Sequence, residues 1–289
     1  MPAGDDAAVL RVPDGRVVAT TDLLVEDRHF RRDWSAAADV GVKAAAQNFA
    51  DVVAMGARPL TLLVGLACPA SLPSGWVLEM VGGMVDECVR AGASIAGGDI
   101  TGADRIMLAI TALGELDGGA PVTRAGARPG DIVAVAGELG RAAAGLGLLR
   151  AGRAAAGGEL GELVRAHLRP RPPYPAGLAA AGRATAMIDV SDGLVQDLGH
   201  IAAASRVGID VATAGLPCPE PVRTAAKLLG VAWPDWALAG GEDHALAGTF
   251  PAGSALPPGW RGIGAVRAGN GVRVDGEPWR GQAGWEHFR

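Results

Sequence analysis

Apolar and polar residues alternate along the first part of the chain in a pattern that predicts short strands separated by longer helices. Apolar runs at 16–22, 60–67, 93–96 and 105–116 have the length of strands. Helical spacing extends over 36–55 and 76–90, and Gly56 and Gly92 predict where these helices end. Ser35 is a candidate cap for the first helix. Strands that alternate with helices favour an α/β or α+β fold.

A second set of elements follows a Gly- and Pro-rich stretch at 117–130. We place a domain boundary in that stretch, which predicts an N-terminal domain over 1–118 and a C-terminal α/β domain over 119–289. The later pattern predicts helices at 141–150 and 159–167, an extended proline-rich segment at 170–175, and a helix after Ser191, which could cap it. Strands are predicted at 131–136, 186–190, 243–250, 262–266 and 271–275.

Composition narrows the class of protein. A chain of 289 residues is near the limit for one hydrophobic core, and 49% hydrophobic residues can fill two. The net charge of −5 and the absence of a basic stripe argue against nucleic acid as a partner. The longest uncharged run, 59–78, is broken by prolines and does not predict a membrane span. Three scattered cysteines and no signal peptide predict a cytoplasmic protein with reduced thiols.

The acidic residues occur at the ends of predicted elements and after glycines. They are Asp5, Asp6, Asp22, Asp51, Asp99, Asp189, Asp192, Glu242 and Asp243. Mg²⁺ prefers oxygen ligands and is commonly held by one or two carboxylates together with substrate phosphates. Phosphoryl transfer depends on positioning and charge neutralisation, so acids, glycines and a few basic groups suit it. Each acid alone is more often a turn residue or a helix cap, and only the repeated arrangement favours metal-assisted chemistry.

Several other site classes are excluded by missing motifs. Neither Lys43 nor Lys227 follows a glycine, so a Walker A loop is absent. The protein-kinase motifs, HExxH and a strand-linked GxGxxG are also absent. Asp189 stands where a serine hydrolase would have the first glycine of its nucleophile turn around Ser191.

Nine segments in order resemble the thiamine-monophosphate kinase family of the aminoimidazole-ribonucleotide synthetase-like superfamily. They are GDDAAVL at 4–10, TTDLLVEDRHF at 20–30, KAAAQNFADVVAMGARP at 43–59, GGD at 97–99, TRAGARPGD at 123–131, HLRP at 167–170, DVSDGL at 189–194, GGED at 240–243 and WEHF at 285–288. The resemblance implies a two-domain fold whose N-terminal sheet pairs with that of a second subunit in a homodimer. It also implies transfer of the γ-phosphoryl group of ATP to thiamine monophosphate, with several Mg²⁺ ions and no essential general base.

The resemblance also implies roles for particular residues. Metal positions fall on Asp6, Thr20, Thr21, Asp22, Asp51, Asp99, Asp189 and Asp192. Nucleotide positions fall on Gly98, Asp99, Arg124 and Ser191, and substrate positions fall on His29, Glu242 and Trp285. A guanidinium at Arg124 suits phosphate, and the ring of Trp285 suits a thiazolium cation. Glu242 could serve the aminopyrimidine end of the substrate either by a hydrogen bond or through its charge.

The chain departs from the family pattern at three places, and other functions stay open. Pro2-Ala3 replaces Gly-Ile and a preceding segment is missing, which suggests a late-assigned start or an incomplete edge of the nucleotide site. Ala50 stands directly before Asp51, where the family usually has a serine, and Glu242-Asp-His-Ala replaces the more usual Glu-Asp-Tyr-Glu. The alternatives are another ATP-using enzyme of the superfamily, a non-catalytic thiamine-phosphate or nucleotide-binding protein, and an α/β domain that merely has acidic turns.

Overall fold

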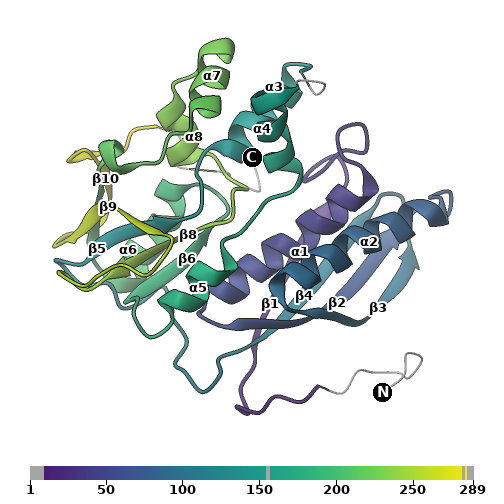
Figure 1. Ribbon diagram of the computed structural model, residues 1–289, viewed down its shortest axis with the longest axis horizontal. Helices are drawn as coiled ribbons and strands as arrows, with labels where there is room; N and C mark the ends of the chain where they lie inside the picture. Colours follow the sequence, from purple (N-terminus) through teal and green to yellow (C-terminus); the bar gives the residue numbers. More distant parts are fainter. Residues whose placement is uncertain (1–9, 154–156, 282–283, 285–289) are drawn as a thin grey trace.

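The computed structural model describes residues 10–153, 157–281 and 284. Two sheets, each with helices packed on it, lie side by side, with the N-terminal sheet at one end of the molecule and the C-terminal sheet at the other (Figure 1). No helix in the described part of the chain is long and apolar enough to cross a membrane.

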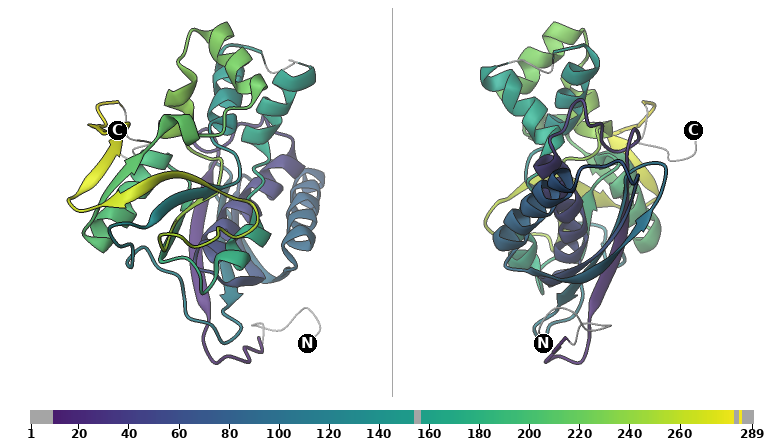
Figure 2. Two further views of the ribbon diagram at one scale, coloured as in Figure 1. Left: turned by 60° about the vertical axis from the view of Figure 1, so that its left-hand side comes forward. Right: turned by 90° about the vertical axis from the view of Figure 1, so that its right-hand side faces the viewer.

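The first sheet has four strands in the order β1-β4-β2-β3, and all neighbours except β2 and β3 are antiparallel. Its strands are β1 (Val18–Val25), β2 (Arg58–Cys68), β3 (Ser94–Gly102) and β4 (Met107–Glu115). Two long helices, α1 (Ala37–Ala54) and α2 (Ser74–Ala91), lie together over one face of this sheet (Figures 1 and 2). That face is apolar and buried, whereas the opposite face keeps Leu23, Leu63 and Met107 partly exposed.

The second sheet has seven strands in the order β11-β10-β7-β9-β5-β8-β6. Its strands are β5 (Ile132–Ala136), β6 (Ala186–Val190), β7 (Gly208–Val211), β8 (Ala245–Phe250), β9 (Trp260–Arg267), β10 (Gly271–Val274) and β11 (Glu277–Pro278). Its helices are α3 (Arg141–Arg150), α4 (Gly158–Leu168), α5 (Tyr174–Ala180), α6 (Leu194–Ser205), α7 (Glu220–Leu229) and α8 (Trp233–Ala239), with a 3₁₀ turn at Thr213–Gly215.

Helix α1 is shared by both halves of the molecule. It packs on β1 and β4 of the first sheet and also on β6 and β8 of the second. One buried cluster accordingly joins Phe49 of α1 and Ile110 of the first sheet to Met187, Leu246 and Phe250 of the second. This shared core fixes the first sheet and the end of β6 relative to each other, which matters for the site described below.

The α/β architecture with two separate sheets confirms the expected fold class, and the first sheet gives way to the second between Glu115 and Ile132. The proposed division into 1–118 and 119–289 remains a prediction about domains. Two predicted caps are wrong. Ala36 precedes α1 in the cap position, with the Asp39 carboxylate accepting its N–H at 3.0 Å, and Gly193 occupies the cap position of α6.

Some element bounds also differ from the predicted ones. Strand β3 continues through Gly98 and Asp99. It lies at the edge of the sheet, so its backbone pairs with β2 alone. Helix α5 begins at Tyr174 inside the segment predicted as extended, since Pro175 fits the first helical turn without needing its N–H. Strand β8 begins at Ala245, because the Asp243 carboxylate instead accepts the N–H groups of Gly140 and Ala142 at 2.6 and 2.8 Å.

Candidate active site

A cleft of about 1150 Å³ lies where α1 faces the carboxyl end of β6. One wall comes from α1 and from the loop that connects β1 to α1. The other wall comes from the turn after β6 and from residues 240–244 before β8. The carboxyl ends of strands are common binding positions in α/β proteins, because loops and helix starts gather there.

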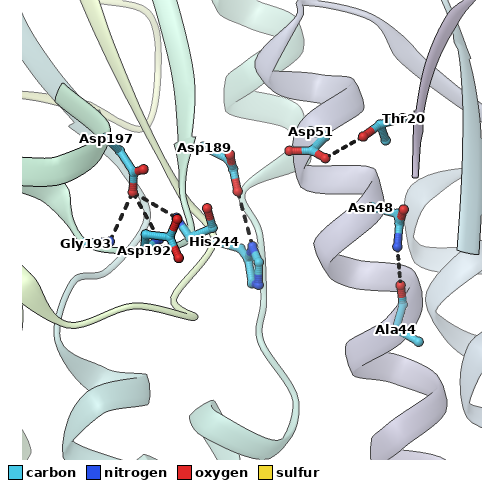
Figure 3. A network of polar contacts seen from close by, with 10 residues as sticks. Thr20, Ala44, Asn48, Asp51, Asp189, Asp192, Gly193, Asp197 and His244 are labelled. Atoms are coloured by element: carbon cyan, nitrogen blue, oxygen red, sulfur yellow. Dashed lines mark hydrogen bonds and ion pairs between the residues drawn. The ribbon is translucent and has the colours of Figure 1, made fainter. Parts of the chain in front are cut away.

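The α1 wall carries Asp22 and Asp51. Asp51 accepts a hydrogen bond from the Thr20 hydroxyl at 2.7 Å, which fixes one of its oxygens. Asn48, one helical turn earlier, accepts the Asp22 N–H at 3.1 Å and donates to the Ala44 carbonyl at 2.9 Å. The predicted shared face of Asn48 and Asp51 is therefore present, and it attaches α1 to β1 (Figure 3).

Asp189 approaches from the opposite wall, at the end of β6. Its Oδ2 atom lies 3.3 Å from Nδ1 of the buried His244 (Figure 3). Burial opposes a charge on His244, but the hydrogen bond and charge of Asp189 outweigh burial, so the pKa of the imidazole is raised. The two residues thus form a buried carboxylate–imidazole pair that faces Asp51 across the cleft.

The carboxylates on the two walls repel one another. Burial, followed by the charges of Asp189 and Asp22, raises the pKa of Asp51 to about 7. The pKa of Asp22 is raised as well, chiefly by burial. A bound cation would remove this repulsion. Within the described ranges no three acidic, histidine or cysteine side chains converge on one point, so an ion here would take one or two carboxylates and complete its shell with phosphate and water.

The turn after β6 carries Ser191 and Asp192 and is held by Asp197 from α6. The Oδ2 atom of Asp197 accepts the N–H groups of Ser191, Asp192 and Gly193 at 3.1, 3.2 and 3.1 Å (Figure 3). This carboxylate does the capping that the sequence assigned to Ser191. Burial raises the pKa of Asp197 to about 7 in spite of these hydrogen bonds. Ser191 itself lines the cleft.

The far end of the cleft contains a buried ion pair. Lys43 of α1 donates to Oε2 of Glu242 at 3.1 Å and to the carbonyl of His29 at 3.2 Å. Nδ1 of His167 lies 3.1 Å from the same oxygen, although it makes no hydrogen bond in this geometry. Burial alone would raise the pKa of Glu242, but Lys43 and then His167 outweigh it and hold that pKa well below its usual value.

Comparison with known proteins identifies the family. Family models for the N-terminal and C-terminal domains of AIR synthase related proteins match residues 4–116 and 128–239. A thiamine-monophosphate kinase of Mycobacterium tuberculosis is 51% identical over 289 residues, which is 99% of this chain and 85% of that protein. The chain belongs to the thiamine-monophosphate kinase family.

Solved structures of family members have the same fold. Thiamine monophosphate kinase from Aquifex aeolicus is 33% identical with a TM-score of 0.88, covering 93% of this chain and 91% of that one. A structure of AaThiL complexed with AMPPCP and TMP has a TM-score of 0.89 at 33% identity, covering 98% and 91% of the two chains. The overall match includes both sheets, so the cleft lies within the shared architecture.

The structure gathers part of the residue set implied by the thiamine-monophosphate kinase family. Eight of its members line the cleft, namely Asp22, His29, Asp51, Arg124, Asp189, Ser191, Asp192 and, at the far end, Glu242. Thr20 stands behind them as the partner of Asp51. Asp6 and Trp285 lie outside the described residues.

Thr21, Gly98 and Asp99 are not brought to this cleft. Thr21 points away from Thr20, to the face of the sheet opposite α1, where its hydroxyl contacts Thr111 Oγ1 at 2.7 Å. Asp99 pairs in register with Gly65, and Gly65 with Ala109, so it lies on that same open face of the sheet. Gly98 is needed for close packing, because a Cβ there would lie 2.0 Å from the Val64 carbonyl oxygen.

Four residues were missed by sequence reasoning: Lys43, His167 and His244, which line the cleft, and Asp197, which holds the turn beside it. A usable signal existed for Lys43, since it is one of two lysines among 26 basic residues. A position that keeps lysine in an arginine-rich chain indicates a need for a compact cation.

Proposed function

We propose that the chain transfers the γ-phosphoryl group of ATP to the phosphate of thiamine monophosphate and so forms thiamine diphosphate. One observation carries this proposal. Asp22 and Asp51, on the side of the first sheet, lie across one cleft from Asp189, which belongs to the second sheet. A set of crowded carboxylates suits a cation that carries phosphates. Membership of the thiamine-monophosphate kinase family supports the identity of both substrates.

Mg²⁺ is the ion that this donor set fits. Asp22, Asp51, Asp189 and Asp192, with Asp6 outside the described residues, would share several such ions with one or two carboxylates to each, and the bound ions would neutralise charge on the transferring phosphoryl group. Asp51 keeps one oxygen on Thr20, which leaves the other oriented to the cleft. Asp197 fixes the backbone from which Ser191 and Asp192 project.

The chain's own groups then position the two substrates. Arg124, Ser191, Gly98 and Asp99 are the proposed nucleotide-binding residues, and His29, Glu242 and Trp285 are the proposed acceptor-binding residues. The acceptor oxygen belongs to a phosphate and is already anionic, so the transfer needs no essential general base. Use of ATP supports the proposed cytoplasmic location.

A direct assay tests this function. Purified protein is incubated with ATP, Mg²⁺ and thiamine monophosphate, and thiamine diphosphate is measured by chromatography. We expect product from the wild type, none without acceptor, and a fall of about 100-fold or more for Asp51→Asn. ADP formation without thiamine diphosphate would favour another acceptor within the superfamily. Ligand binding without any ADP would favour the non-catalytic alternative.

We propose further that two copies pair through the open face of the first sheet. Leu23, Leu63 and Met107 on this face are 51%, 38% and 39% exposed, and apolar side chains grouped on one exposed face are typical of protein–protein contacts. Thr21 and Asp99, which the family resemblance places in the site, lie on the same face. A second copy packed there would give both residues new neighbours, and it would explain why one chain leaves them outside its cleft.

The oligomeric state tests the pairing. Light scattering should give the wild type about twice the chain mass of 29.1 kDa. Leu63→Glu places a charge on the open face and should give a monomer with reduced activity. Leu78→Glu is the matched control, because Leu78 is 72% exposed on α2 at the other side of the sheet. A dimer that persists in Leu63→Glu would contradict pairing through this face.

A further inference from the structure

The ion pair between Lys43 and Glu242 joins the two halves of the molecule inside the cleft. Lys43 belongs to α1 and is 3% exposed, while Glu242 stands 199 positions later, just before β8. A buried lysine is costly unless it is paired and hydrogen-bonded, and this one has both a carboxylate and a carbonyl as acceptors. Its stem and ammonium group therefore occupy one fixed position in the cleft wall.

Glu242 is held from more than one direction. Its backbone is left-handed, with φ of 66°, and its N–H donates to the Ser191 carbonyl at 2.7 Å. A Cβ on the preceding Gly241 would lie 2.4 Å from the same carbonyl oxygen, so the approach of the two loops is close. A non-glycine residue in this conformation costs free energy, and such strain concentrates where a side chain must point in one direction.

The two oxygens of Glu242 are not equivalent. Lys43 and His167 both contact Oε2, at 3.1 Å each. No residue in the described part of the chain is hydrogen-bonded to Oε1, and the side chain is 32% exposed to the cleft. One oxygen is thus committed to the protein and the other is offered to a ligand.

The charge of Glu242 is also matched within the protein. The positive charge of Lys43 balances the negative charge of Glu242. This end of the cleft therefore presents a hydrogen-bond acceptor with little net charge. A cationic ring gains little from a carboxylate that is already paired. A neutral N–H donor, in contrast, gains a charge-assisted hydrogen bond to Oε1.

We infer that Lys43 is a positioning and specificity-determining residue, which orients Glu242 so that Oε1 accepts a hydrogen bond from a neutral exocyclic amine of the acceptor. This inference rests on the proposed function, in which the acceptor carries an aminopyrimidine. It decides between the two roles open for Glu242 in favour of hydrogen bonding. The thiazolium cation must then be recognised elsewhere in the site.

Substrate analogues and lysine variants test the inference together. Thiamine monophosphate is compared with the analogue in which oxygen replaces the exocyclic amine, both for turnover and for binding by calorimetry. The wild type should prefer the amine by about tenfold or more in kcat/KM, as expected for loss of a hydrogen bond to a charged group. Lys43→Met should reduce that preference to less than about threefold and raise KM for thiamine monophosphate, with KM for ATP unchanged.

Two further variants provide controls. Lys43→Arg keeps the charge and should retain most of the preference for the amine. Lys227→Met removes the other lysine, which is exposed on α7 outside the cleft, and should change nothing. Circular dichroism and the thermal midpoint separate a misfolded variant from a folded one with altered specificity.

Each contrary result has its own meaning. If Lys43→Met keeps the wild-type preference while KM for ATP or kcat changes, Lys43 serves the phosphates and the inference is overturned. If the variant behaves as the wild type throughout, the ion pair is structural only, which also overturns it. If the wild type forms no thiamine diphosphate and its calorimetry shows no preference for the amine, the proposed function fails and this inference fails with it.

Discussion

At the scale of single residues, the buried carboxylates that suit cation binding lower the stability of the folded protein. Asp51 is ionised at low cost in an unfolded chain, where its pKa is near 3.8, but burial and its acidic neighbours raise the pKa to about 7 in the folded protein. Between these values the folded protein binds more protons than the unfolded chain, so its stability falls as pH rises. Above about 7 the difference is constant.

Asp51→Asn should therefore stabilise the protein while strongly lowering its activity. The amide cannot ionise, so without Mg²⁺ or nucleotide the variant should gain about 1–3 kcal/mol over wild type at pH 8 and almost nothing at pH 4. Thermal melts at intervals of pH measure this difference. Mg²⁺ with ATP should raise the midpoint of the wild type more than that of the variant. A constant difference at all pH values would show that Asp51 is not the responsible group.

Sequence reasoning located residues whose position shows in the local pattern, and their roles stay predictions. Asp51 shares a helical face with Asn48, and Asp189 lies near the end of β6. Asp22 was expected at a strand end but lies inside β1, although it too lines the cleft. Sequence reasoning failed for Lys43, because a buried ion pair with Glu242 across 199 positions leaves no local trace.

At the scale of elements, the turn between β6 and α6 is the part of the site whose shape depends most on one side chain. Asp197 binds three consecutive N–H groups, a concave arrangement that suits a negative charge. Its carboxylate keeps Ser191 and Asp192 in place although it does not line the cleft.

Asp197→Asn should weaken metal activation more than folding. The amide oxygen can still accept the N–H groups but without a full charge, so the Mg²⁺ concentration for half-maximal activity should rise about tenfold or more. Asp131→Asn is the control, because Asp131 is also buried and accepts the Arg128 N–H at 2.9 Å, away from the cleft. Equal Mg²⁺ dependence in both variants would argue that Asp197 has a structural role alone.

Elements were predictable where periodicity was strong. The spans of α1, α2, α3 and α4 and of most strands agree with the hydrophobic pattern to within a few residues. Helix α7 was missed although it has ten residues. Helix α8 and strand β7 were missed because α8 is short and starts with Trp233-Pro234 and because β7 has four residues. The burial of such short elements is set by tertiary packing, which outweighs their local preference.

At the scale of the whole molecule, the shared position of α1 decides how the protein unfolds. Phe49 is fully buried in a cluster that includes residues of both sheets, and its ring meets Tyr174 edge-on at 6.1 Å. Tyr174 in turn donates to Glu87 of α2 at 2.5 Å and lies under Arg90, so α5 of the second half is attached to α2 of the first. Neither sheet buries this apolar surface without the other.

The molecule should therefore unfold in one cooperative step in spite of its two sheets. Phe49→Ala should cost about 3–5 kcal/mol and move a single calorimetric transition to lower temperature without splitting it. Ile209→Ala, in a cluster that belongs to the second sheet alone, should lower the same transition. Two transitions in Phe49→Ala, with the upper one at the wild-type temperature, would mean that the second half folds by itself. In that case the cleft would be assembled by docking of two stable domains. The Lys43–Glu242 pair would then be a contact between two separately folded domains.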